Sequence, residues 1–188
     1  MVDIFLKRKK DVLSKLDKSH IGSWDEKIAN LCNKINAEKR YYTTSSCSGR
    51  IILMIEQDKK AENLFISVYH DKISFKQLKE DLKSALKTGK NIKFKLEPCI
   101  LHVACRSLED AEKMQEKGKL SGWKKSGIIG TRNGFSVELN GTDRLEFPVI
   151  QNNRILIDDE FLKIVVAESN KKLEKSWEKI RKMEKLMK

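Results

Sequence analysis

The segment 42–50 reads YTTSSCSGR and is rich in groups that can bind an anion. Its serines, in particular Ser45, Ser46 and Ser48, offer hydroxyl and backbone N–H donors, Gly49 allows a tight bend, and Arg50 adds a forked guanidinium. Donors of this kind together favour a phosphate or a carboxylate. The alternative is an ordinary serine-rich turn with a solvated Arg50. No sequence feature places a histidine beside Cys47, so a nucleophilic thiol is not favoured.

Two histidines lie in segments that could face a ligand. In SHIGSWD (19–25), His20 and Asp25 flank a glycine bend at the expected start of a helix, where free N–H groups can meet a polar ligand. In ILHVACRS (100–107), alternation puts His102 on one strand face with Ala104 and Arg106. The alternatives are that Asp25 only complements the helix dipole and that His102 is a packing residue.

The segment GWKKSG (122–127) combines an indole with two cations and two glycines. Trp123 could stack on an unpaired base, while Lys124 and Lys125 could contact the phosphate backbone. The alternative is that Trp123 is a core residue that anchors a loop.

Helices are expected at 4–17, from Ser23, from Ser74, at 107–117 and from Asp158 onward, on the evidence of apolar spacing and capping residues. Strands are expected at 41–45, 51–56, 64–70, 92–96, 99–105, 135–139 and 145–149, the first two forming a hairpin. This order predicts one α+β domain over 1–188 with a mixed β-sheet covered by helices, and basic N- and C-terminal helices, the latter over 158–188. The chain lacks the GxGxxG fingerprint, so no Rossmann-type fold is expected.

The composition of the chain indicates which classes of partner and location to expect. The 188 residues carry 39 Lys and Arg against 27 Asp and Glu, a net charge of +12 that favours a polyanion such as nucleic acid. Residues 1–20 contribute +3 and residues 171–188 contribute +5. The longest apolar run, 51–55, is too short to span a membrane, and the N-terminus lacks a signal segment, so a cytoplasmic protein is expected. The four cysteines include no CxxC pair, which predicts reduced thiols and no metal site.

Several long segments resemble the tRNA wybutosine-synthesising protein 3 family, in order and over nearly the whole chain. The most specific is TTSSCSGR (43–50), and the others lie within 19–42, 97–114, 121–128, 137–149 and 161–180. The resemblance implies an α+β methyltransferase unrelated to the Rossmann enzymes. Such an enzyme passes a methyl group from S-adenosylmethionine to a ring nitrogen, N-4, of the wyosine-type guanosine beside the anticodon of phenylalanine tRNA. One departure is the segment around Asn140 and Gly141, where an arginine or a similar polar residue and a serine are expected.

On the matching positions, the expected roles divide into three groups. The cofactor or anion site comprises Ser45, Ser46, Ser48, Gly49 and Arg50. His102 and Asp25 are the candidates for orienting the acceptor ring or taking its proton, and the substrate-binding candidates are His20, Arg106, Trp123, Lys124 and Ser126. The basic termini would hold tRNA phosphates, and the sequence does not give the oligomeric state. A basic tRNA-binding module without an active site, or a structural RNA-associated factor, is the competing interpretation.

Overall fold

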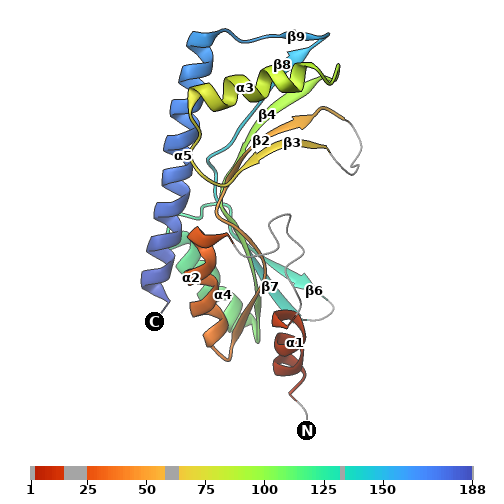
Figure 1. The fold of residues 1–188 in the computed structure, drawn as a ribbon. Helices are drawn as coiled ribbons and strands as arrows, with labels where there is room; N and C mark the ends of the chain where they lie inside the picture. The colour runs from red at the N-terminus through yellow and green to blue at the C-terminus, as the bar shows by residue number, and fades with distance from the viewer. Residues whose placement is uncertain (1–2, 15–24, 58–63, 132–133, 188) are drawn as a thin grey trace. The chain divides into compact units, whose positions relative to one another are not determined.

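The computed structural model describes residues 3–14, 25–57, 64–131 and 134–187, which form two compact units (Figure 1). The first unit comprises Met1–Ser48, Cys99–Thr142 and Ser176–Lys188, and the second comprises Gly49–Pro98 and Asp143–Lys175. No helix in the described part of the chain is long and apolar enough to cross a membrane.

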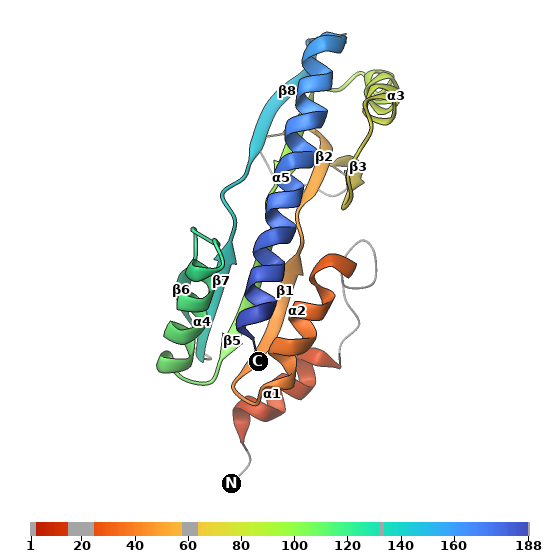
Figure 2. The ribbon, with the colours of Figure 1, turned by 90° about the vertical axis from the view of Figure 1, so that its left-hand side faces the viewer.

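A four-stranded antiparallel sheet forms the centre of the first unit. Its strands, in spatial order, are β1 (Tyr41–Cys47), β5 (Ile100–Cys105), β7 (Gly134–Asn140) and β6 (Gly127–Thr131). Helices α2 (Glu26–Ala37) and α4 (Leu108–Leu120) pack on one face, and α1 (Ile4–Leu13) lies against the other (Figures 1 and 2). The face toward α2 and α4 is apolar because alternate side chains point to it, among them Leu101, Val103, Val137 and Leu139, all fully buried.

A five-stranded antiparallel sheet forms the centre of the second unit. Its strands, in spatial order, are β3 (Phe65–Tyr69), β2 (Arg50–Ile55), β4 (Ile92–Glu97), β8 (Leu145–Gln151) and β9 (Arg154–Ile155). Helix α3 (Phe75–Leu86) begins at Ser74, whose hydroxyl accepts the backbone N–H of Gln77 at 3.2 Å, as the sequence predicts. The long helix α5 (Asp159–Leu186) contributes its first part to this unit and its last turns, from Ser176, to the first unit.

The α+β class and the absence of a doubly wound parallel sheet are confirmed. The mixed sheet is wrong, since every strand pair in the described chain is antiparallel. Two of the described helices connect strands of the same sheet: α3 joins β3 to β4, and α4 joins β5 to β6. In both cases the connected strands flank an antiparallel strand, β2 or β7, and do not pair with each other. The chain forms two compact units, and that they make up a single domain stays a prediction.

The expected hairpin at 41–56 is also wrong. β1 pairs with β5, whereas β2 pairs with β3 and β4, so the chain leaves one sheet and enters the other between them. Gly49, with φ of +106°, makes the bend. Two smaller differences concern the N-terminal region: α1 ends at Leu13, and α2 is capped by Asp25, Ser23 lying outside the described residues. The strand β6 is not among the strands expected from the sequence, because its two glycines weaken the strand pattern.

Candidate active site

His102 stands in the middle of a row of facing residues that crosses the first unit's sheet. Ser45 of β1 pairs with His102 of β5, which pairs with Glu138 of β7, which pairs with Gly127 of β6. His102 Nε2 lies 2.9 Å from Glu138 Oε2. Their side chains are 27% and 35% exposed, so the imidazole is accessible and held by a carboxylate. These residues lie on the sheet face opposite α2 and α4.

Arg106 follows His102 and Ala104 on the same face, as alternation predicts, but its guanidinium is engaged by the N-terminal helix. Arg106 Nη2 donates to Asp3 Oδ2 at 2.6 Å. Asp3 also caps α1 by accepting the backbone N–H groups of Phe5 and Leu6 at 3.1 and 3.2 Å. The bond from the Leu6 N–H, followed by the charge of Arg106, lowers the pKa of Asp3 from its ordinary value of 3.8. Arg106 therefore tethers α1 to the sheet.

The Phe5 ring makes a second tie between α1 and the His102 face. It lies 5.1 Å, centroid to centroid, from the ring of Tyr42, which is the neighbour of Ala104 across β1 and β5. Lys9 Nζ makes a third, donating to the carbonyl of Glu38 at 2.5 Å. These contacts fix the basic helix α1 to the first unit, on the sheet face that carries His102, with Lys7 and Lys10 exposed to solvent.

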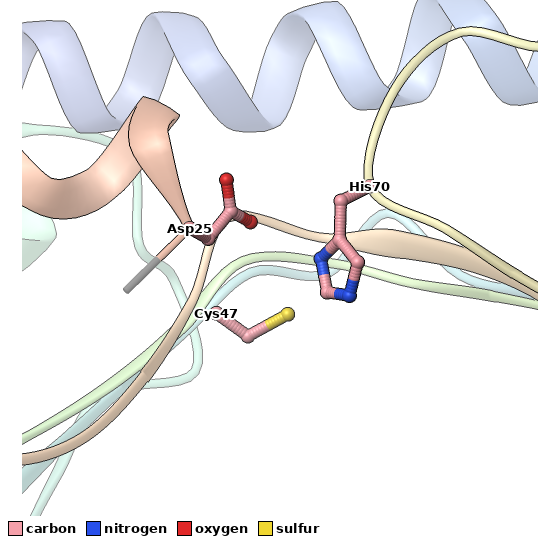
Figure 3. Close-up of side chains that lie close together, drawn as sticks. All are labelled: Asp25, Cys47 and His70. Atoms are coloured by element: carbon pink, nitrogen blue, oxygen red, sulfur yellow. The ribbon is translucent and has the colours of Figure 1, made fainter. Parts of the chain in front are cut away.

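Asp25 joins the start of α2 to the end of β1. One carboxylate oxygen accepts the backbone N–H of Lys27 at 3.2 Å, which is the N-cap bond of α2. The other accepts both the backbone N–H of Ser48, at 3.1 Å, and the Ser48 hydroxyl. Asp25 and the thiol of Cys47 lie close together, within 4.8 Å (Figure 3). Asp25 therefore has a structural role whether or not it meets a ligand, and His20 lies outside the described residues.

The serines of 45–48 differ in what they can offer a ligand. Ser45 is exposed and Ser46 half-buried, and no hydrogen bond of either hydroxyl occurs within the described part of the chain. Ser48 is fully buried and gives both of its donors to Asp25. Ser45 and Ser46 can thus donate to a bound molecule, while Ser48 fixes the backbone beneath them.

Arg50 opens β2 in the second unit. Its Nε donates to Glu97 Oε2 at 2.8 Å, and its guanidinium carbon lies 5.3 Å from the centroid of the Phe65 ring. The side chain is 30% exposed. The ion pair uses the Nε side of the guanidinium fork, which leaves the Nη side as the part able to bind an anion.

Trp123 corrects an expectation from the sequence. Its indole is fully buried in the first unit, where Nε1 donates to the carbonyl of Lys179 at 3.3 Å. A buried indole presents no face on which a base could stack, so Trp123 is a core residue. Ser126 is likewise engaged internally: its hydroxyl donates to the Trp123 carbonyl at 2.5 Å. Lys124 remains exposed and available.

Glu138 was not among the residues predicted from the sequence. The alternation of 135–139 could have placed it on the polar face of its strand, but not opposite His102. Asn140, on the same side of β7 by alternation, is 7% exposed, and its Oδ1 is buried without a hydrogen-bond partner in the described structure. The sheet thus brings His102, Glu138 and Ser45 together.

Residues 7–188 match the family described as Methyltransferase TYW3. This chain belongs to that family. A "tRNA wybutosine-synthesizing protein 3 homolog" of Danio rerio is 34% identical over 184 residues, which cover 95% of this chain and 72% of the relative. A Pyrococcus horikoshii relative, "tRNA(Phe) 7-((3-amino-3-carboxypropyl)-4-demethylwyosine(37)-N(4))-methyltransferase 2", is 37% identical over 158 residues, covering 83% of this chain and 76% of the relative.

Solved structures agree with this membership of the TYW3 methyltransferases. The structure of the PH1069 protein from Pyrococcus horikoshii superposes with a TM-score of 0.88 at 29% identity, covering 99% of this chain and 97% of that one. A protein from Aeropyrum pernix superposes with a TM-score of 0.73 at 22% identity, covering 87% and 96%, and supports the fold alone. The resemblance in the sequence, and with it the methyltransferase class, is confirmed.

Proposed function

We propose that this TYW3 family member transfers a methyl group from S-adenosylmethionine to N-4 of the demethylwyosine-type guanosine of phenylalanine tRNA, and that it acts in the cytoplasm. The observation that carries the proposal is the 37% identity with the Pyrococcus horikoshii relative named for this N(4)-methyltransferase activity on tRNA(Phe). A Thermococcus sibiricus relative with the same activity in its name is 31% identical over 95% of this chain.

The groups on segment 45–50 suit the cofactor's polar parts. Ser45 and Ser46 offer hydroxyls without partners in the described chain, and the Nη side of Arg50 suits the carboxylate of the methionine moiety. The Asp25–Ser48 bonds would keep the backbone beneath Ser45 and Ser46 in place. When bound, S-adenosylmethionine supplies an activated methyl group on a sulfonium sulfur.

The chain's own residues must place the acceptor nitrogen and receive its proton. His102 is accessible on the sheet, and its imidazole is a group that can accept this proton. Most of the acceleration would come from positioning, because a methyl transfer requires the nucleophile and the leaving group to be collinear. Asp25 would act through Ser48 and the neighbouring backbone.

The basic helices would bind the tRNA backbone. Lys7 and Lys10 of α1 and Lys124 are exposed in the first unit, which also holds His102. Each lysine laid against a phosphate releases counterions, so binding should weaken steeply with salt. The phosphate contacts would hold the anticodon arm, while the modified base enters the site.

The deciding assay gives purified protein, alone, to tRNA(Phe) that carries the demethylwyosine-type base, together with S-adenosylmethionine labelled in its methyl group. The proposal expects the label in the base at N-4, and no label in a fully unmodified transcript of the same tRNA. Absence of transfer with correctly folded protein and binding of both tRNAs alike would favour the non-catalytic binding module instead.

The cofactor assignment has its own test. Arg50→Ala should weaken binding of S-adenosylmethionine by a factor of about 10 or more in calorimetry, as for the loss of one charged hydrogen bond. Arg154→Ala, an exposed arginine at β9 of the same unit, is the matched control and should bind as the wild type does. Unchanged affinity in Arg50→Ala would remove Arg50 from the cofactor site.

A further inference from the structure

The imidazole of His102 has one ring nitrogen assigned by its surroundings. Nε2 lies 2.9 Å from Glu138 Oε2, and an ionised carboxylate can only accept a hydrogen bond. A neutral imidazole carries one N–H, so this bond favours the tautomer with the proton on Nε2. The lone pair is then on Nδ1, the nitrogen that faces away from the carboxylate.

We propose that Glu138 is the positioning residue of the active site: it holds His102 in the Nε2–H tautomer, so that Nδ1 accepts the proton that the acceptor nitrogen releases. This inference rests on the proposed function. Glu138 touches the histidine and not the reacting atoms, and its part is to orient the ring and stabilise the imidazolium that forms. A carboxylate behind a basic imidazole serves in this way in other enzymes.

The chemistry requires a base at this point. The acceptor, named as a demethylwyosine N(4), bears a hydrogen where the product bears a methyl group. One N–C bond forms with the electron pair of the nitrogen, and one S–C bond breaks as the sulfonium becomes a neutral thioether. The N–H bond breaks as well, its electron pair staying on nitrogen and its proton passing to His102 Nδ1. The imidazolium later returns the proton to water.

The surroundings of the pair leave room for a flat base. Ser45, the neighbour of His102 on β1, is small and exposed, and Gly127, the neighbour of Glu138 on β6, has no side chain. A Cβ built on Gly127 would meet no atom within 4 Å. Two residues beyond Glu138, the buried Oδ1 of Asn140 lacks a partner in the described structure, which points to a polar group or a water at that end.

The orientation of the histidine can be read by nitrogen NMR. The chain has only three histidines, so His102→Asn assigns the His102 signals directly. In the wild type at a pH where the ring is neutral, the inference expects the Nε2–H tautomer. Glu138→Ala should remove this preference, whereas Glu138→Gln should keep it in part, because the amide oxygen still accepts from Nε2–H.

Kinetics give the second readout. Glu138→Ala should lower the single-turnover rate by a factor of about 10 to 100, less than the factor of about 100 or more expected for His102→Asn. Affinities for S-adenosylmethionine and tRNA should stay within about two-fold, and Glu138→Gln should recover part of the rate. Glu146→Gln, which removes a carboxylate that pairs with Lys93 and Lys95 in the other unit, is the control and should behave as the wild type.

The outcomes distinguish a wrong role for Glu138 from a wrong proposed function. If the wild type transfers methyl groups but Glu138→Ala keeps both its rate and the His102 tautomer, the inference is overturned. A rate loss matched by an equal loss of cofactor affinity, with the tautomer unchanged, would also overturn it, since the glutamate would then act only on folding or binding. If the wild type transfers nothing, the proposed function fails. Should Glu138→Ala not fold, Glu138→Gln carries both readouts.

Discussion

Substitutions of Asp25 can distinguish a structural role of this residue from a chemical one. Replacing it by alanine removes the N-cap of α2 and both acceptor contacts to Ser48. The cap contributes about 1 kcal/mol. Ser48 is fully buried, so its N–H and hydroxyl lose a charged acceptor without water to replace it, at about 1 to 3 kcal/mol for an unsatisfied buried group. We expect Asp25→Ala to lower the free energy of unfolding by about 3 kcal/mol.

For a chain of this length, about 3 kcal/mol corresponds to a fall in Tm of about 6 to 12 °C. Thermal unfolding followed by circular dichroism measures it. Asp25→Asn retains a good cap and one acceptor oxygen, so it should lose about 1 kcal/mol and fold normally at assay temperature. If Asp25 also acts on the acceptor, Asp25→Asn will be folded and slow.

A double-mutant cycle with Ser48→Ala tests the contact itself. The two residues should couple by about 1 to 2 kcal/mol, because either single change already breaks the same hydroxyl bond. Additive effects of Asp25→Ala and Ser48→Ala, or a Tm of Asp25→Ala within about 1 °C of the wild type, would refute the reasoning.

Three further predictions follow from burial and from the ties of α1. Trp123→Ala should destabilise the protein by about 3 to 5 kcal/mol in denaturant unfolding, and the more conservative Trp123→Phe, if folded, should bind tRNA normally; weaker binding by a stable Trp123→Phe would return the indole to the ligand site. Because the pKa of Asp3 is lowered, its contribution to holding α1 is fully present above its ordinary value of 3.8 and is lost as pH falls through the lowered pKa. Asp3→Asn should therefore raise amide exchange in α1 at pH 7, and it should abolish the increase in α1 exchange that acid causes in the wild type. Equal exchange in both proteins would contradict the contact between Asp3 and Arg106. Burial raises the pKa of Cys105 to about 12, so iodoacetamide at pH 8 should alkylate the half-buried Cys47 well before Cys105, as peptide mass spectrometry can show, and equal rates would contradict the burial.

Local signals in the sequence predicted local structure well. The capping serines before α3 and α4 lie where the sequence places them, because each cap is completed within three residues. Alternation likewise put His102 and Arg106 on one strand face. These features depend on neighbours along the chain, which the sequence displays directly.

Pairings between distant segments could not be predicted in the same way. The partner of β1 is β5, more than 50 residues later, and nothing in 41–56 distinguishes that pairing from a hairpin. Glu138 became visible beside His102 only through the register of β5 with β7. Trp123 was ambiguous because an indole suits both a core and a stacking site, and burial decided between them.

The division of the chain has a consequence for its synthesis. The first unit draws on three separated stretches, and the last of them, from Ser176, supplies the fully buried Ile180 and Met183. During synthesis, the apolar residues of α2 must therefore stay uncovered until the segment from Ser176 has been made. Removing the last turns of α5 would uncover that core. The contribution of the lysines in 171–188 to RNA binding therefore has to be measured by neutralising single charges in the otherwise unchanged chain.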